Sequence, residues 1–281
     1  MAVSGTVARP PRAAFFDLDK TLIPGSSLFL LARGAYERDM FRVRDLLRFG
    51  WGQLTFRLRG EHERNMEMSR SSTLDFVTGR NQRELVAWGC EIAEERILPR
   101  VYADIVRVID GHRDRGDLTF LVTAAPIELA ETIAQELGMT GAIATVSEVD
   151  EHGNYTGRLA GPVMHGPVKA DAVADVARTR GIDLQDCAAY SDSINDLPLL
   201  ESVGFPHAVN PEAELRRIAL TRGWPIHELR TRRRALLIGI PAGLGGAALF
   251  GSGVAVGMAM QRRRLEVHPG RLRRALARAG L

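Results

Sequence analysis

The sequence predicts an α/β fold in which helices flank a parallel β-sheet, with an inserted helical cap and a C-terminal membrane helix. Three observations favour this fold. Short apolar runs that end in a hydroxyl or a carboxylate alternate with helical patterns. A long stretch after the first of these runs has helical spacing and few strand signals. A run of 26 residues without a charge lies close to the C-terminus.

Four apolar runs are the expected strands, and each has the length of a buried strand in a parallel sheet. They cover residues 13–18, 118–123, 187–191 and 205–209, and helical patterns occur at 127–137, 169–180 and 211–221. Strands that alternate with helices in this way predict a Rossmann-like sheet. In such sheets, ligands bind outside the carboxyl ends of the strands.

Residues 24–100 interrupt this alternation. They are rich in Leu, Phe, Arg and Glu at helical spacing, so we expect a helical cap inserted after the first strand. The catalytic core would then be discontinuous and comprise residues 1–23 and 101–229. Within the core, residues 142–159 contain two strand-like runs around a glycine turn, which predicts a β-hairpin.

The uncharged run covers residues 235–260, and its 26 residues suffice to cross roughly 30 Å of hydrocarbon. Seven glycines and Pro241 make it a poor soluble helix, although a buried soluble helix is the alternative. We therefore predict one transmembrane helix, which would make the membrane a partner of the chain. Arginines flank the run on both sides, so the side reached by the basic tail, residues 261–281, is left open.

Charge is distributed unevenly along the chain. Residues 230–281 hold 11 Arg and one acid, whereas residues 1–229 hold 26 basic and 33 acidic residues. The overall charge of +3 therefore combines an acidic body with a basic tail. An acidic body argues against nucleic acid as a partner. Membrane contact accounts for the tail better than the alternative, nucleic-acid binding through the tail alone.

Cysteine content and the N-terminal residues bear on the compartment. Cys90 and Cys187 are the two cysteines, and their spacing matches no disulfide framework, which favours a reducing compartment. The N-terminus shows no apolar stretch long enough for a signal peptide. We therefore expect a single-pass protein of the cell membrane with its catalytic domain in the cytoplasm. The oligomeric state is left open.

Two aspartates, Asp17 and Asp19, close the first expected strand. Positions i and i+2 of an extended chain point to the same side, so both carboxylates can face one site. Two like charges there are costly unless a cation or a proton lies between them. A solvated turn is the alternative, but the apolar residues on both sides of the pair favour a buried site.

A second acidic cluster, from Ser191 to Asp196, closes the third expected strand and contains Asp192 and Asp196. In a parallel sheet it reaches the same edge as Asp17 and Asp19. Oxygen ligands that converge from separate strands suit Mg²⁺, which binds one or two carboxylates together with waters and phosphate oxygens. We therefore predict Mg²⁺ as the cofactor.

Thr123 ends the second expected strand, and Ala124, Ala125 and Pro126 follow it. A hydroxyl beside consecutive backbone amides can bind phosphate, and the N-terminus of the next helix would strengthen this binding. These residues are therefore a candidate phosphate-binding cradle.

Lysine is rare in this chain, which contains 35 Arg but only Lys20 and Lys169. Each lysine is a candidate for a position that requires a compact ammonium group. Lys169 opens a predicted helix, where its charge opposes the helix dipole, so a purely structural role is less favoured. We expect Lys169 to screen the repulsion between Asp17 and an incoming phosphate.

In chain order, these four motifs resemble those of haloacid dehalogenase superfamily phosphatases, and most closely the phosphoserine phosphatase-like branch (subfamily IB). The resemblance covers residues 13 to about 225. It implies a Mg²⁺-dependent phosphatase that hydrolyses small phosphomonoesters through an aspartyl-phosphate. The 105 residues between Asp17 and Thr123 leave room for the helical cap of that family.

The resemblance also implies residue roles. Asp17 would be the nucleophile, and Asp19 would be the general acid that later activates water. Mg²⁺ would be held by Asp17, the Asp19 carbonyl and Asp192, with Asp196 in a supporting role. The phosphate would be bound by polar groups from three motifs, Thr123, Ala124, Lys169 and Asn195.

One position departs from the family pattern. Phosphoserine phosphatases carry a glutamate nine residues after the nucleophile, where it contacts the amino group of the substrate, and this chain has Ser26 there. The substrate is therefore left open. A lysophospholipid-type phosphate at the membrane is one alternative, and a non-catalytic, membrane-attached regulatory protein is another.

Overall fold

The computed structural model describes residues 12–38, 74 and 77–229. The chain divides into two units, Met1–Leu229 and Arg230–Leu281, and all described residues belong to the first. The predicted membrane helix and basic tail, residues 235–281, lie outside them. Within the described ranges, no helix is both long and apolar enough to span a bilayer.

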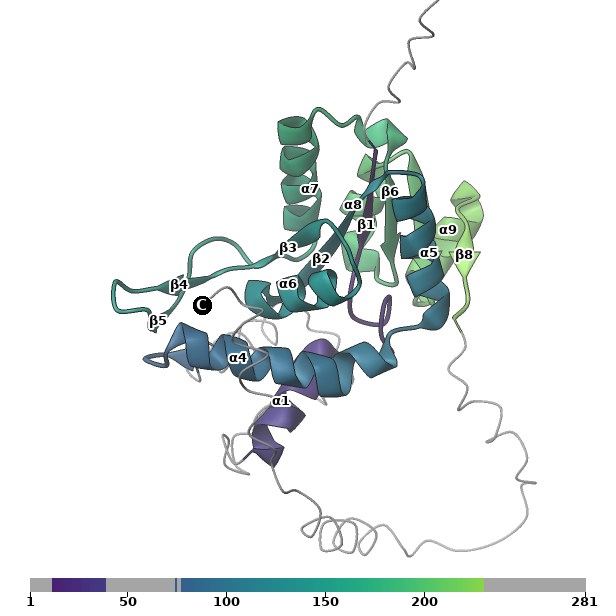
Figure 1. The fold of residues 1–281 in the computed structure, drawn as a ribbon. Helices are drawn as coiled ribbons and strands as arrows, with labels where there is room; N and C mark the ends of the chain where they lie inside the picture. The colour runs from purple at the N-terminus through teal and green to yellow at the C-terminus, as the bar shows by residue number, and fades with distance from the viewer. Residues whose placement is uncertain (1–11, 39–73, 75–76, 230–281) are drawn as a thin grey trace, which may run out of the picture. The chain divides into compact units, whose positions relative to one another are not determined.

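A six-stranded sheet forms the centre of the first unit (Figure 1). Each pair of neighbouring strands is parallel, which confirms the predicted parallel α/β sheet. In spatial order the strands are β3 (Gly141–Thr145), β2 (Leu118–Pro126), β1 (Ala13–Phe16), β6 (Ala188–Ser191), β7 (Phe205–Val209) and β8 (Ile226–His227). Strands β1 and β6, which precede the two acidic motifs, are therefore neighbours.

Helices cover both faces of the sheet, so the central strands are buried. Successive residues of β1 point to opposite faces, and Phe16 therefore packs toward α5 and α6 whereas Phe15 packs toward α7, α8 and α9. The helices of the core are α5 (Ala103–Asp114), α6 (Ile127–Glu136), α7 (Pro167–Arg180), α8 (Leu197–Ser202) and α9 (Ala213–Arg222), with short 3-10 turns η3 (Leu184–Asp186) and η4 (Ile194–Asp196).

The predicted hairpin at 142–159 is only partly correct. Its first run is split, because β3 pairs with β2 in the main sheet and only β4 (Ser147–Val149) pairs antiparallel with β5 (Tyr155–Leu159). Strand β8 is a further addition to the four predicted strands. Both β3 and β8 are held by backbone pairing to a neighbouring strand, which no local apolar pattern reveals.

The described part of residues 24–100 is helical, as expected. It contains α1 (Ser27–Glu37) and α4 (Gln82–Ile92), which continues into a π-helical turn, η1 (Ala93–Ile97), and a 3-10 turn, η2 (Leu98–Arg100). Figure 1 shows α1 and α4 on the side of the sheet where β1 ends. Gly34 lets the two helices approach closely, since a Cβ there would lie 2.4 Å from Ile92 Cδ1. Residues 39–73 are not described, and the division into cap and core stays a prediction.

The β4–β5 hairpin connects this helical region to the core. Its backbone bonds to residues just before and at the start of α4, with Gly79 N donating to Tyr155 O at 2.8 Å and Gln82 N donating to Gly153 O at 2.9 Å. The Tyr155 hydroxyl donates to Glu128 Oε1 of α6 at 2.7 Å. The hairpin therefore bonds to both α4 and α6.

Candidate active site

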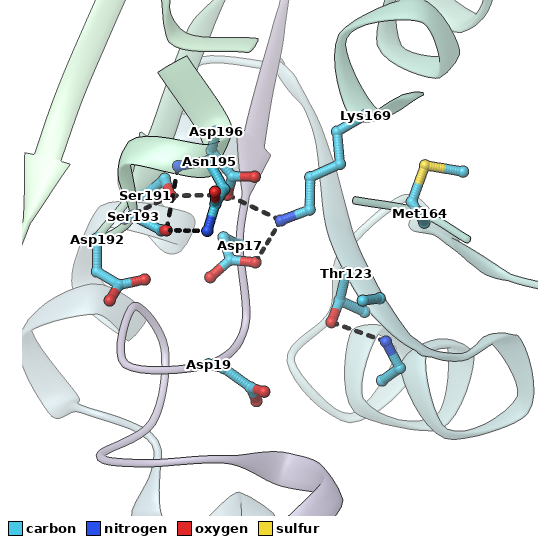
Figure 2. A network of polar contacts seen from close by, with 12 residues as sticks. Asp17, Asp19, Thr123, Met164, Lys169, Ser191, Asp192, Ser193, Asn195 and Asp196 are labelled. Atoms are coloured by element: carbon cyan, nitrogen blue, oxygen red, sulfur yellow. Dashed lines mark hydrogen bonds and ion pairs between the residues drawn. The ribbon is translucent and has the colours of Figure 1, made fainter. Parts of the chain in front are cut away.

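Four separate segments meet at the carboxyl ends of β1, β2 and β6 (Figure 2). Asp17 follows β1, Thr123 lies near the end of β2, Asp192 follows β6, and Lys169 extends from α7. Asp17 N donates to Tyr190 O at 3.0 Å, which joins the ends of β1 and β6. The structure thus brings one residue from each predicted motif to the same edge of the sheet.

The Lys169 ammonium lies between two carboxylates. Nζ donates to Asp17 Oδ1 at 2.6 Å and to Asp196 Oδ2 at 2.8 Å. Exposed fractions of the three side chains are only 4% for Lys169, 9% for Asp17 and 3% for Asp196. Burial opposes the charged form of Lys169, but the two carboxylates outweigh it and raise its pKa. Lys169 is therefore a buried, permanent cation.

Asp196 holds Lys169 in place, because its Oδ2 also accepts a hydrogen bond from Ser191 Oγ at 2.7 Å. Ser191 is fully buried at the end of β6 and was not predicted as a site residue. The signal that singled out Thr123, a hydroxyl at the end of a buried strand, was present at Ser191 too. The pair Ser191–Asp196 thus connects the second acidic motif to the lysine.

Asp17 is buried beside this ion pair. Burial raises the pKa of Asp17 to about 7, Lys169 opposes the rise, and the neighbouring Asp196 and Asp192 carboxylates add to it. One ammonium group therefore does not fully compensate the charge at this position. A further positive charge beside Asp17 would favour its ionised form.

Asp19 faces the start of α1. Its Oδ1 accepts a hydrogen bond from Ser27 N at 2.8 Å. Burial raises the pKa of Asp19, and the bonds from Ser27 oppose this rise. Ser27 was not predicted as a site residue, because any residue type can donate a backbone amide hydrogen bond. The preceding residue, Ser26, is the N-cap of α1 and its Oγ accepts from Phe29 N.

Asp192 presents a buried carboxylate oxygen just beyond the end of β6. Only 4% of its side chain is exposed, and among described residues Oδ2 has no hydrogen-bond partner. The nearest cation is Lys20, whose Nζ lies 3.4 Å from Oδ2. Burial raises the pKa of Asp192 to about 6, Lys20 opposes this, and Glu212 and Asp196 add to it. A buried carboxylate oxygen of this kind is suited to bind a cation.

The predicted phosphate-binding residues lie on either side of Asp17. Thr123 Oγ1 accepts a hydrogen bond from Ala125 N at 3.2 Å, and the Ala124 carbonyl accepts one from Thr145 Oγ1 at 2.9 Å. Asn195 belongs to η4, where its Nδ2 donates to Ser193 Oγ at 3.2 Å. The hydroxyl of Thr123 can still donate to a phosphate oxygen, because Oγ1 acts only as an acceptor in its bond to Ala125.

The oxygen ligands at this edge of the sheet fit Mg²⁺. Asp17 and Asp192 supply two carboxylates at neighbouring strand ends, and Asp192 Oδ2 is buried without a hydrogen-bond partner among the described residues. No group of three or more His, Cys, Asp or Glu side chains in the described ranges is placed to hold a metal by itself. Mg²⁺ usually requires fewer, since it takes one or two carboxylates and completes its shell with waters and phosphate oxygens.

Comparison with known proteins agrees with this geometry. The sequence profile of haloacid dehalogenase-like hydrolases matches residues 14–201. The chain is 42% identical over 268 residues to the phosphoserine phosphatase SerB1 of Mycobacterium tuberculosis, which covers 94% of this chain and 87% of that protein.

Solved structures share the fold. A Bordetella pertussis protein of unknown function is 32% identical, with a TM-score of 0.70 over 79% of this chain and 100% of that one. An apo phosphoserine phosphatase, 20% identical, has a TM-score of 0.53 over 82% of this chain and 100% of that one, and this likeness concerns the fold alone. The chain therefore belongs to the haloacid dehalogenase-like hydrolase family, which confirms the resemblance and the enzyme class that its motifs predicted.

Proposed function

We propose that this chain is a Mg²⁺-dependent phosphomonoester hydrolase that acts through an aspartyl-phosphate on Asp17. The observation that carries the proposal is the buried arrangement of Asp17, Lys169 and Asp196, in which Lys169 Nζ lies 2.6 Å and 2.8 Å from the two carboxylates. A carboxylate can attack an anionic phosphate only where positive charge is already in place. Lys169 supplies part of that charge.

Each step has a residue placed for it. A carboxylate oxygen of Asp17 would form a bond to phosphorus while the bond from phosphorus to the leaving oxygen breaks, and Asp19 would give that oxygen a proton. Asp19 would then take a proton from the water that hydrolyses the aspartyl-phosphate. The raised pKa of Asp19 favours the first of these transfers, because the carboxyl group must carry a proton to donate one.

Phosphate binding is assigned to Thr123, Ala124, Lys169 and Asn195. Mg²⁺, when held by Asp17, Asp192 and the Asp19 carbonyl, would neutralise the negative charge that accumulates as phosphate approaches. Asp196 would act by holding Lys169 rather than by binding the metal, since its Oδ2 already accepts bonds from Lys169 and Ser191.

Phosphoserine is the first substrate candidate because the relative from Mycobacterium tuberculosis bears that name. A second candidate, a lysophospholipid-type phosphate, is favoured by an apolar pocket between α1, α4, α6 and β5. Its lining includes Leu28, Leu31, Trp88, Leu129 and Tyr155. Leu28 follows Ser27, whose amide bonds to Asp19, so an apolar group attached to the phosphate could enter here.

We place the enzyme at the cell membrane, with residues 235–260 as a single span and the catalytic domain in the cytoplasm. Support comes from the 26 uncharged residues between arginine clusters. Fractionation of cells that express the full-length chain, and a chain lacking residues 230–281, tests this proposal. The full-length chain should sediment with membranes and the shortened chain should not; a soluble full-length chain would contradict it.

Phosphate release by the purified full-length chain tests the activity. Substrates should include phosphoserine, sugar phosphates and lysophosphatidate, each with Mg²⁺ and with a chelator. We expect Mg²⁺-dependent release, and Asp17→Asn should lower it by roughly 10³-fold or more. Asp175→Asn, an exposed aspartate on α7, is the matched control and should retain activity.

Two results would reject the proposal. Full activity of Asp17→Asn would exclude Asp17 as the nucleophile. Absence of release across the panel, with Mg²⁺ still bound, would favour the membrane-attached regulatory protein instead.

A further measurement distinguishes the two substrate candidates. A rise of kcat/KM with alkyl chain length that is lost in Trp88→Ala would select the lysophospholipid-type phosphate.

A further inference from the structure

Lys20 occupies an unusual backbone position beside the catalytic aspartates. Its φ is +59°, a left-handed conformation that glycine adopts without steric cost and that other residues seldom take. Both peptide groups that flank its Cα are held, because Lys20 N donates to Gly25 O at 3.1 Å and Asn210 Nδ2 donates to Lys20 O at 3.3 Å. The direction in which its side chain leaves the backbone is therefore restricted.

The Lys20 side chain ends next to a buried acid. Nζ lies 3.4 Å from Asp192 Oδ2, the oxygen with no hydrogen-bond partner among the residues described. The side chain of Lys20 is 60% exposed, whereas that of Asp192 is 4% exposed. The ammonium therefore approaches Asp192 from solvent and can leave again, which the buried Lys169 cannot do.

The charges around the site are not balanced. The described residues around the site include five carboxylates and two ammonium groups, those of Asp17, Asp19, Asp192, Asp196, Glu212, Lys20 and Lys169. With all of them ionised, negative charge is in excess, and a divalent cation would offset part of it. Lys169 is already shared by Asp17 and Asp196, so Lys20 is the cation available to Asp192.

We infer that Lys20 is a built-in counter-cation of the metal site, which compensates Asp192 in the metal-free protein and is displaced into solvent when Mg²⁺ binds. This inference rests on the proposed Mg²⁺ site. Lys20 and Mg²⁺ would compete for the same oxygen and repel each other, so the lysine weakens Mg²⁺ binding. Lys20 positions Asp192 and offsets the charge of its carboxylate in the metal-free protein, and it takes no part in bond formation.

The test is calorimetric titration of Mg²⁺ into the metal-free, full-length chain, without substrate. Lys20→Met removes the ammonium, and Lys20→Gly removes it while suiting the left-handed backbone, so one variant folds even if the other does not. Both should bind Mg²⁺ about two- to fivefold more tightly than the wild type, the range expected for loss of a partly exposed ion pair. Lys20→Arg keeps the charge and should bind with wild-type affinity.

Arg12→Met is the matched control, because Arg12 pairs with Asp186 at 3.3 Å at the other end of β1. It should leave Mg²⁺ affinity unchanged. Unchanged or weaker Mg²⁺ affinity in both Lys20→Met and Lys20→Gly would overturn the inference. If Mg²⁺ affinity is unchanged and the KM for phosphate release rises, Lys20 acts on the substrate instead. Absence of Mg²⁺ binding by the wild type would overturn the cofactor proposal, and this inference with it.

Discussion

Two buried clusters of side chains lie close together along β1 and β6, and they differ in charge. One contains ionised groups, and the other consists of neutral rings. The acidic cluster consists of Asp17 and Asp196, which share Lys169, and the neighbouring Asp192, just beyond the ends of β1 and β6. The ring cluster lies one residue before Asp17 on β1 and two residues before Asp192 on β6, and it extends to β7, β8 and α5. Its members are Phe16, Tyr190, His112, His207 and His227.

The ring cluster is satisfied by stacking and by hydrogen bonds, one of which joins His112 Nδ1 to the Asp117 carboxylate at 2.8 Å. The Tyr190 ring lies between Phe16 and His207, with both centroid distances at 4.5 Å. The Tyr190 hydroxyl bonds to His112 Nε2 at 2.9 Å, and His207 Nδ1 lies 3.0 Å from His227 Nε2. Burial, with smaller contributions from the other two histidines, lowers the pKa of His207 to about 4. This cluster is therefore uncharged at neutral pH.

The two clusters give opposite contributions to stability as pH changes. For Asp17, with a pKa raised from 3.8 to about 7, the folded state holds the proton more tightly, so this contribution is full below pH 3.8 and is lost as pH rises through 7. For His207, whose pKa falls from 6.5 to about 4, the contribution is full above pH 6.5 and is lost as pH falls toward 4. Unfavourable charge at neutral pH is thus confined to the site, as expected where function rather than stability selects the residues.

Removing the buried cation should break the acidic cluster most severely. Lys169→Met leaves Asp17 and Asp196 without their shared partner, so we expect a loss of about 3 to 5 kcal/mol in the free energy of unfolding. Phosphate release should fall with it. Thermal unfolding of the full-length chain measures the first effect. Arg178→Met, which removes an exposed ion pair from the same helix, is the control, and an equal effect of both substitutions would contradict the prediction.

Removing a charge from the acidic cluster should instead stabilise the metal-free protein. Asp192→Asn eliminates a buried carboxylate whose pKa is raised to about 6, so at pH 8 we expect a gain of about 1 to 2 kcal/mol. The same substitution should abolish the rise in Tm that we expect from the proposed Mg²⁺ site. Thermal unfolding with and without Mg²⁺ measures both. A variant that is less stable yet still stabilised by Mg²⁺ would show that Asp192 is not a metal ligand.

The ring cluster should respond to acid. Between pH 7.5 and pH 5 the wild type should lose about 1 to 2 kcal/mol through His207, after allowance for its partial exposure. His207→Phe keeps a ring against Tyr190 and removes the titration, so its pH profile should lack this loss. His152→Gln, at an exposed hairpin position, serves as the comparison. Identical profiles for wild type and His207→Phe would exclude His207 as the source.

The smallest effect is expected at Tyr190. Tyr190→Phe keeps the stacking but removes the hydrogen bond to His112, which should cost about 1 kcal/mol of stability. Activity should be unchanged, because the hydroxyl points toward α5 and not toward the acidic cluster. Urea unfolding and phosphate release measured on the same preparation check both statements. A large loss of activity would show that the two clusters are coupled.

Residue type and local pattern were enough to predict much of this protein. The alternation of apolar runs with helical patterns predicted the parallel sheet, and the acidic motifs predicted which strand ends meet. The pattern failed where pairing is non-local: β3 was assigned to a hairpin, and β8 was not predicted. Ser191 and Ser27 were missed because their roles depend on contacts with Asp196 and Asp19.

The sequence by itself determined the fold class and the candidate residues of the site, because apolar periodicity and acidic residues at strand ends are local properties. Only the tertiary structure decided the balance of charge. Strand order places β1 beside β6, and α7 carries Lys169 between Asp17 and Asp196. It also separates an acidic cluster that requires a cation from a ring cluster that stays neutral. Burial and distance set these electrostatic energies, and both arise only when segments far apart in the chain come together.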